Sequence, residues 1–287
     1  MNKLDIILAC EDLGVHVDGT NEGPKRIAND LKLEDTKLVE KKDIVKNHDV
    51  NNKKKNLDGV NDFNERLYKE AYNSLEKGNK ILTLGGDHSL AIASALASIK
   101  KNEKMGIIWV DAHGDYNTFE TTITGNLHGL PLAVIDGYEK KLLSDFHTGN
   151  NYSPNNTVII GARDLDDLER ENLKDAGVTI FTTKDIRNRG VNEIVNEAIK
   201  IASSNVNKVH ISYDIDVIDP LVAPGVSIPA IDGINEEEAY GIMDKLLEHK
   251  DLINSFDIVE YNPSRDIDNK TNKIVLKLVN KVINNLL

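Results

Sequence analysis

The chain has 287 residues, 40% of them hydrophobic, which is an ordinary size for one large α/β domain, so we expect a single domain spanning residues 1–287. Its formal net charge of −12, with no basic cluster on a plausible recognition element, argues against nucleic acid as a partner but allows cationic substrates. The single cysteine, Cys10, excludes a cysteine-rich metal site.

The N-terminal run LDIILAC (residues 4–10) is long enough for a strand but lacks the cleavage pattern of a signal peptide. No apolar stretch of the sequence approaches membrane-spanning length. We therefore expect a protein with no membrane partner and a cytoplasmic location.

Apolar runs with strand character then alternate with helical patterns along the chain. We predict strands over residues 4–10, 36–40, 80–84, 106–110, 156–161, 178–181, 207–213 and 254–260. Helical patterns separate most neighbouring strands, as parallel pairing requires. The predicted fold is therefore α/β: a three-layer, doubly wound, mostly parallel sheet with helices on both faces.

Two further segments are predicted to lie at the periphery of this fold. The stretch 44–60, which is rich in lysine and asparagine, is interpreted as a surface excursion without a catalytic role. The C-terminal segment TNKIVLKLVNKVINNLL has the periodicity of an amphipathic helix. We expect that helix to pack on the sheet of its own subunit.

Acidic and histidine-bearing motifs end several of the apolar runs. They are GGDHS (85–89), DAHGD (111–115), HISYDIDVID (210–219) and DIVEYNP (257–263). Doubly wound sheets bind ligands beyond the carboxyl ends of their strands, where these acidic segments lie. Asp111 and His113 are two residues apart, as are Asp214 and Asp216, and this spacing places both side chains of a pair on one face of a strand.

Each motif alone also has a plainer interpretation. A lone Asp-x-Asp pair in a loop is usually solvated or caps a helix. Asp87 is interpreted as the N-cap of the helix in SLAIASALASIKK, which leaves His88 as the metal ligand of that motif. The joint occurrence of such motifs, each after a buried-looking strand, favours one shared site.

Charge balance indicates that this site holds a pair of metal ions. Asp111, Asp115, Asp214 and Asp216 would repel one another in a low-dielectric cleft unless cations lie between them. Oxygen and imidazole ligands suit divalent transition metals, and manganese is the most natural choice for so oxygen-rich a set. Water between two such ions loses its proton near neutral pH, so we expect a hydroxide nucleophile. The predicted metal ligands are His88, Asp111, His113, Asp115, Asp214 and Asp216.

The segments GGDHSL, DAHGDYNT, TGNLHG, SYDIDVIDP and DIVEYNP occur in the order and approximate spacing of the ureohydrolase superfamily, and in detail the chain resembles the arginase family. The resemblance extends from EDLGVHVDGTNEGPKRI to Glu260 and covers nearly the whole chain. It implies one metal ion on His88, Asp111, Asp115 and Asp214. It implies a second ion on Asp111, His113, Asp214 and Asp216, with Asp111 and Asp214 bridging the two.

The resemblance also implies a catalytic set of Asp115, His128 and Glu260. Glu260 would pair with the guanidinium of the substrate, whereas a strand-end carboxylate can also simply face solvent. His128 in TGNLHG would shuttle a proton to the departing amine, whereas a lone loop histidine is often structural or exposed. Attack on the guanidinium carbon then yields urea and an amine.

Substrate selection depends on two other groups of residues. An arginine substrate needs neutral donors for its α-carboxylate, which Asn117, Thr124 and Asn126 could supply. It needs carboxylates for its α-ammonium, and Asp166 and Glu169 match positions that serve this purpose in arginases. These two acids could instead form the acidic N-terminus of a helix. No role is predicted for His16, His48, His147, His210 or His249, and His210 is interpreted as a packing or supporting residue.

Departures from the arginase pattern leave alternatives open. Asp167 and Leu168 stand where arginases carry Pro and Gly, and Ser227 and Ile228 stand where they carry Gly and Thr. We favour L-arginine as the small-molecule guanidino substrate, cleaved to L-ornithine and urea. Another ureohydrolase activity, such as that of agmatinase, guanidinobutyrase or formiminoglutamase, stays open, as does a non-catalytic metal-binding paralogue. The resemblance also suggests a homo-oligomer, either a trimer or a hexamer.

Overall fold

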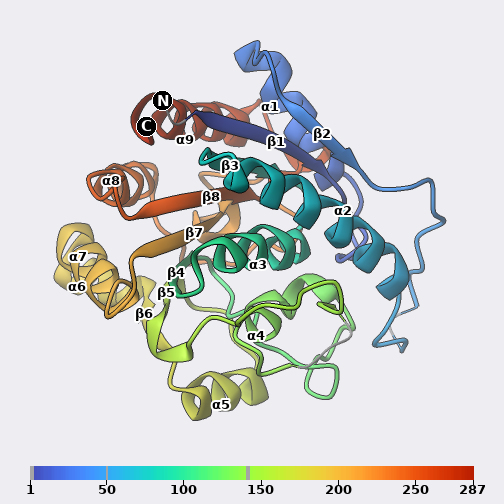
Figure 1. Cartoon of the computed structure of the whole chain (residues 1–287), viewed down its shortest axis with the longest axis horizontal. Helices are drawn as coiled ribbons and strands as arrows, with labels where there is room; N and C mark the ends of the chain where they lie inside the picture. Colours follow the sequence, from blue (N-terminus) through green and yellow to red (C-terminus); the bar gives the residue numbers. More distant parts are fainter. Residues whose placement is uncertain (1–2, 50, 140–142) are drawn as a thin grey trace.

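The computed structural model describes residues 3–49, 51–139 and 143–287. Its centre is an eight-stranded sheet in the order β2-β1-β3-β8-β7-β4-β5-β6, and every strand pairs in parallel (Figure 1). The strands are β1 Leu4–Cys10, β2 Lys37–Glu40, β3 Lys80–Gly85, β4 Met105–Val110, β5 Thr157–Ala162, β6 Thr179–Thr182, β7 Lys208–Asp214 and β8 Ile253–Val259. The predicted doubly wound α/β sheet is confirmed. The prediction was for a mostly parallel sheet, and all the strand pairs of this sheet are parallel.

Helices cover both faces of the sheet, as parallel crossovers demand (Figure 1). One face carries α1 Gly23–Leu31, α6 Thr183–Arg189, α7 Val191–Ala202, α8 Glu236–Leu247 and α9 Lys270–Asn285. The other face carries α2 Leu57–Glu76, α3 Ala91–Asn102 and α4 Pro131–Ile135. The remaining helix, α5 Asp167–Ala176, buries Leu173 in the core of this second face. The three layers predicted from the alternation are therefore present.

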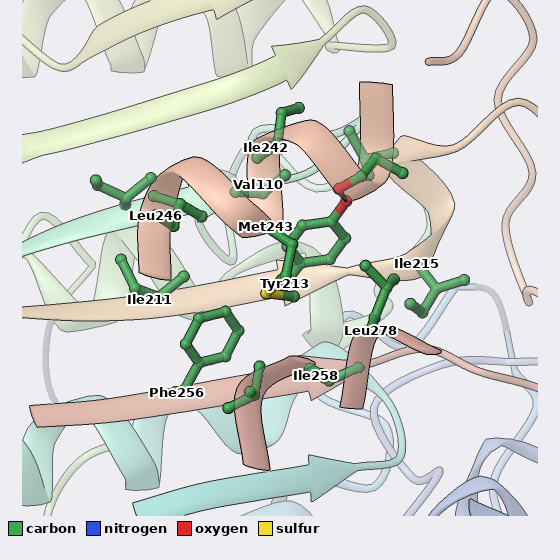
Figure 2. Packing of buried hydrophobic residues seen from close by; sticks show 14 of the residues in the cluster. Val110, Ile211, Tyr213, Ile215, Ile242, Met243, Leu246, Phe256, Ile258 and Leu278 are labelled. Carbon is green, nitrogen blue, oxygen red and sulfur yellow. Dashed lines mark hydrogen bonds between the residues drawn. The ribbon is translucent and has the colours of Figure 1, made fainter. Parts of the chain in front are cut away.

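Alternation along β7 separates an apolar face from a polar one. Ile211 and Tyr213 pack with Phe256 and Ile258 of β8 against α8 and α9, as Figure 2 shows. Each such side chain contributes about 1.5–3 kcal/mol when fully buried. The intervening residues of β7, which include His210 and Ser212, are all polar and point to the opposite face, toward α3.

His210 belongs to a buried polar network beneath α3. Its Nε2 lies 3.1 Å from Asp257 Oδ2, and its Nδ1 lies 2.6 Å from Ser255 Oγ. Ser94 donates a hydrogen bond to Asp257, and Ser98 donates to Ser255 Oγ at 2.5 Å. These contacts pair most of the polar groups, which would otherwise be costly to bury, whereas Asp257 Oδ1 has no hydrogen-bond partner among the described residues. This agrees with the prediction that His210 is a packing or supporting residue.

The stretch 44–60 departs from its prediction at its C-terminal end. Most side chains between 44 and 54 are exposed or half-buried, but Lys55 is only 2% exposed and α2 already begins at Leu57. Lys55 is covered because its Nζ donates a hydrogen bond to the backbone oxygen of Thr124, 2.7 Å away. The prediction of a surface excursion is therefore wrong for Lys55 and for the helical end of the stretch, where Gly59 and Val60 are buried. A lysine run gives no sign of a partner as distant as Thr124.

The C-terminal helix α9 packs within its own subunit, as predicted. Ile274, Val275, Leu278, Val279 and Val282 are buried against the sheet, and the helix contacts α1 and α8. Their recurrence every three or four residues forms one apolar stripe. Within the part of the chain that the structure describes, no helix is both long and apolar enough to cross a bilayer.

Asp136, which follows α4, is a buried carboxyl group outside the acidic motifs. The hydroxyls of Tyr116 and Thr157 donate hydrogen bonds to it at 3.2 and 3.0 Å. Burial raises the pKa of Asp136 from 3.8 to about 8. The stability contributed by its protonated form is therefore fully present below pH 3.8 and is lost as the pH rises through about 8.

Asp136→Asn is expected to flatten this pH dependence, because asparagine copies the shape and neutrality of the protonated acid. The free energy of unfolding of the wild type should fall between about pH 5 and about pH 8. The corresponding fall in the variant should be smaller by at least ~1 kcal/mol. Urea denaturation at both pH values measures the difference. An equal change in the free energy of unfolding of both proteins would show that Asp136 is ionised in the folded state.

Candidate metal centre

The acidic motifs converge at the carboxyl edge of the sheet because the strands that precede them are neighbours. β3, β8, β7 and β4 are adjacent at its centre. His88 follows β3, Glu260 follows β8, Asp214 ends β7 and Asp111 follows β4. Since parallel strands all end at one edge, residues more than a hundred positions apart meet there.

A first group of side chains surrounds one atom of His88. Its Nδ1 lies 3.0 Å from Asp111 Oδ2, 3.1 Å from Asp115 Oδ2 and 3.0 Å from Asp214 Oδ2. All of these residues are buried. Ligand atoms of His88, Asp111 and Asp214 lie within 4.8 Å of one another, close enough to hold one metal ion.

A second group of metal-binding character shares Asp111 with the first. It consists of Asp111, His113 and Asp216, with ligand atoms again within 4.8 Å. His113 Nδ1 lies 2.9 Å from Asp216 Oδ2 and 3.4 Å from Asp111 Oδ1. Asp111 thus turns one oxygen toward each group. Asp214 belongs to the first group, and its other oxygen accepts the Asp216 N–H at 2.7 Å.

The two-residue spacing brings these pairs together for a different reason from the one predicted. β4 ends at Val110, so Asp111 and His113 lie in a bend and not on a strand face. The His113 N–H donates to Asp111 Oδ1 at 2.7 Å, as the Asp216 N–H donates to Asp214. The side chains of Asp111 and Asp214 therefore each stabilise a turn of the backbone, which brings His113 and Asp216 into the cluster.

The electrostatics of the cluster favour bound cations. Burial opposes a charged His88, yet its hydrogen bonds to Asp111, Asp115 and Asp214 raise the pKa of His88 well above its ordinary value. Burial and the nearby Asp111 raise the pKa of Asp115 to about 6. The donor set of carboxylate oxygens and imidazole nitrogens also matches the ligand preferences of divalent ions. These residues therefore fit a pair of metal ions in both charge and chemistry.

Two side chains that the sequence analysis missed hold the cluster in place. The indole of Trp109 stacks on the His88 ring, with centroids 3.9 Å apart, and its Nε1–H donates to Asp111 Oδ2 at 2.9 Å. Ser212 Oγ lies 2.8 Å from His88 Nε2, which leaves Nδ1 to face the carboxylates. Trp109 and Ser212 each precede a predicted ligand by two positions, and that spacing is the signal that could have identified them.

Glu260 and His128 lie against this cluster. Glu260 Oε1 accepts hydrogen bonds from the His88 N–H and from His128 Nδ1–H, each at 2.9 Å. Glu260 Oε2 is buried and has no hydrogen-bond partner within residues 3–49, 51–139 and 143–287. Burial opposes charge on His128, but the Glu260 carboxylate raises the pKa of that histidine. The plainer interpretation of Glu260 as a solvent-facing carboxylate is wrong.

Backbone strain coincides with two residues of the predicted catalytic set. Asp115 and Glu260 adopt φ values of 50° and 68°, in the left-handed region that side chains other than glycine rarely occupy. Such conformations persist where the surroundings over-determine them, and they cluster at functional sites. The Glu260 N–H donates to the Gly86 oxygen at 2.8 Å and helps to hold this turn.

A cavity of about 340 Å³ borders the cluster. His113, Asp115 and His128 line it, so it connects solvent with both metal-binding groups. The other predicted site residues that line it are Asn117, Thr124, Asn126, Asp166 and Glu169. Its wall therefore combines neutral donors from the segment 117–126 with the carboxyl groups of the segment 164–169.

Asp166 and Glu169 also have the structural role that was the alternative prediction. Together they form a capping box at the N-terminus of α5. Glu169 accepts hydrogen bonds from the Tyr116 N–H at 2.9 Å and from the Asp166 N–H at 3.3 Å, and burial raises its pKa to about 8. Glu169 thus supports the wall, whereas Asp166 Oδ2 accepts from Asn117 Nδ2 at 3.2 Å.

The departures from the arginase pattern fall at two places around this cavity. Asp167 and Leu168 form the first turn of α5, where Leu168 is exposed. Ile228 lines the cavity, whereas Ser227 accepts a hydrogen bond from the Asn262 side chain at 3.1 Å. His16, for which no role was predicted, lines the cavity as well, with its Nδ1 2.8 Å from Asn126 Nδ2. His16 lies within the segment EDLGVHVDGTNEGPKRI, but the sequence gives no sign of this contact, because the contact depends on the loop after β1.

A parallel α/β sheet with clustered carboxylates and imidazoles at its carboxyl edge, beside an open cavity, is the architecture of metal-dependent hydrolases. The sequence model of the Arginase family matches residues 3–284. The arginase of Staphylococcus aureus strain COL is 37% identical over 96% of this chain and 95% of its own length. The chain belongs to the arginase family, which confirms the predicted resemblance.

Solved structures agree with this assignment. The arginase of Bacillus caldovelox superimposes with a TM-score of 0.87 at 31% identity, covering 99% of this chain and 98% of that one. An arginase of Entamoeba histolytica, crystallised with L-ornithine, gives a TM-score of 0.90 at 28% identity, covering 98% of this chain and 99% of that one. The shared fold thus spans nearly the whole length of each protein.

Proposed function

We propose that this protein hydrolyses L-arginine to L-ornithine and urea with the help of two divalent metal ions, manganese being favoured. Membership of the arginase family and the paired His/Asp groups support the proposal. The similar arginase of Entamoeba histolytica was crystallised with L-ornithine, the amino acid product of this reaction. The trimeric or hexameric assembly and the cytoplasmic location stay predictions.

The lining of the cavity, which combines carboxyl groups with neutral hydrogen-bond donors, supports an amino acid as the substrate. An α-amino acid presents an ammonium and a carboxylate on the same carbon atom. Asp166 offers a carboxylate to the first, whereas Thr124 and Asn126 offer neutral donors to the second. One cavity that has both kinds of partner beside a metal centre suits L-arginine better than a substrate lacking either group.

The chain's own residues would hold the metal ions and the guanidinium. One ion would lie among His88, Asp111, Asp115 and Asp214, and the other among Asp111, His113 and Asp216. When bound, the ions would activate a water molecule for attack on the guanidinium carbon. The unpartnered Glu260 Oε2 would accept hydrogen bonds from the guanidinium, since its other oxygen is occupied.

His128 would carry the proton that the departing amine requires. Its ring lines the cavity and retains 14% of its side-chain exposure, so it can exchange protons with solvent. Its Nδ1 is fixed on Glu260, which leaves Nε2 as the atom that holds or releases the proton. A proton delivered from Nε2 to the side-chain nitrogen of the nascent ornithine makes that nitrogen a good leaving group.

Product release from a panel of substrates tests the proposal. The manganese-loaded protein should release urea from L-arginine with a higher kcat/KM than from agmatine, because agmatine lacks the carboxylate. Formamide release from formiminoglutamate, assayed alongside, should be slower still. Faster turnover of agmatine or formiminoglutamate would establish the corresponding alternative activity. Binding of L-arginine without any product would identify a non-catalytic paralogue.

A further inference from the structure

Lys55 is a buried lysine with an unusual environment. Its Nζ donates to the Thr124 oxygen at 2.7 Å, and no carboxylate forms an ion pair with it among the residues that the structure describes. Nearby lysines differ, since Lys41 pairs with Asp12 and Lys46 with Asp18. Burial lowers the pKa of Lys55, as expected for a desolvated ammonium. Asp49 interacts with this ammonium electrostatically but does not form an ion pair with it. A buried charge without a paired counter-charge is costly and points to an anion that arrives from outside.

The segment that carries Lys55 is held against the loop that provides the neutral donors of the cavity. Lys53 Nζ donates to the Glu120 oxygen at 2.7 Å. Gly125 has a φ of 67°, and a Cβ atom there would lie 2.9 Å from the Asn52 oxygen, so the two backbones are in close contact. The ammonium of Lys55 thus lies directly behind the backbone of a loop whose other side lines the cavity.

That loop directs neutral donors toward the cavity. Thr122 Oγ1 accepts the Gly125 N–H at 3.1 Å, and Thr124 Oγ1 accepts the Asn126 N–H at 3.2 Å. Because each hydroxyl already accepts a hydrogen bond from the backbone, its own proton is available for a ligand. Thr122, Thr124 and Asn126 all line the cavity, and none of them carries a charge.

Most of the charge elsewhere around the cavity is negative. Asp115, Asp164 and Asp166 line it and would repel an entering carboxylate, whereas burial favours the neutral form of Glu169. Neutral hydroxyls and an amide alone offset this repulsion poorly. A cation behind the loop makes the potential on that side more positive and so favours an entering carboxylate.

We propose that Lys55 determines substrate specificity: its buried charge makes the segment 122–126 select a carboxylate-bearing guanidino substrate over one with a neutral or cationic tail. This inference rests on the proposed function. Lys55 does not contact the substrate in this arrangement, because its charge acts through the segment 122–126 that it supports.

Lys55→Gln tests the charge, because glutamine can still donate a hydrogen bond toward the Thr124 oxygen. The kcat/KM for L-arginine should fall about tenfold through a higher KM, equivalent to ~1.4 kcal/mol, with kcat little changed. The kcat/KM for agmatine should stay constant or rise. Calorimetry should show weaker binding of L-ornithine and unchanged binding of putrescine. Lys55→Arg, which keeps the charge, should retain most of the preference for arginine.

Lys53→Met is the matched control, since exposed Lys53 also holds the loop through a backbone oxygen but lies at the surface. It should leave the ratio of the two kcat/KM values unchanged. An equal fall for both substrates in Lys55→Gln, or no fall for either, would show that Lys55 merely clamps the loop. Lys55→Met replaces the glutamine variant if that protein does not fold. Failure of the proposed function would be visible separately, as wild-type protein that releases no urea from L-arginine.

Discussion

Replacing Asp111 by asparagine is expected to abolish nearly all activity and to lower the metal content from two ions per chain to one or none. Asp111 is the residue that both metal-binding groups share, and its two oxygens face different histidines. An amide cannot supply the negative charge that two cations require, so kcat should fall by at least about 10³-fold. Elemental analysis of the purified variant measures the metal content, and urea release measures the activity.

Asp136→Asn provides the control for this experiment, because it makes the same substitution at a buried aspartate outside both metal-binding groups. It should keep its full metal content and its activity. Two ions bound per chain of Asp111→Asn, with affinity equal to that of the wild type, would show that the ligand assignment is incorrect.

Glu260→Gln is expected to lower kcat/KM for L-arginine by about a hundredfold, or ~3 kcal/mol, while the metal content stays constant. Glutamine retains an oxygen that can accept from the His88 N–H, but it removes the charge that would face the guanidinium. Glu260 belongs to neither metal-binding group, so the ions should remain. Steady-state kinetics and elemental analysis of one preparation test both parts.

Glu11→Gln is a matched control for Glu260→Gln. Glu11 is also fully buried, and burial together with Asp87 raises its pKa well above the ordinary value, which favours its neutral form. Glutamine can accept hydrogen bonds at Oε1 and donate one toward Asp87, as the protonated acid does. The control should therefore keep kcat/KM. A Glu260→Gln variant that behaves like this control would exclude Glu260 from substrate binding.

The general position of the site could be predicted from the sequence because it follows from a topological rule. Apolar runs that alternate with helical patterns predict parallel strands, and parallel strands end at one edge. Asp111, Asp214 and Glu260 each end or follow such a run, so their convergence did not require knowledge of the strand order. The exact local geometry did not follow, since Asp111 and His113 meet through a bend and not through the pleat of a strand.

The residues that support the metal ligands could be predicted only in part. Trp109 and Ser212 stand two positions before predicted ligands, which marks them as candidates, but their contacts with His88 exist only once β3, β4 and β7 are assembled. Lys55 lies in a polar run that resembles a surface loop, and its partner is 69 positions away. Contacts between loops depend on packing that no local periodicity encodes.

The position of Trp109 gives the protein a built-in optical reporter. It is the one tryptophan of the chain, and its ring is stacked on His88 and bonded to Asp111. Any ion that enters between these two side chains changes the polarity and the hydrogen bonding that the indole experiences. We therefore expect intrinsic emission excited at the red edge of the absorption band to follow metal loading in real time, free of background from other indoles.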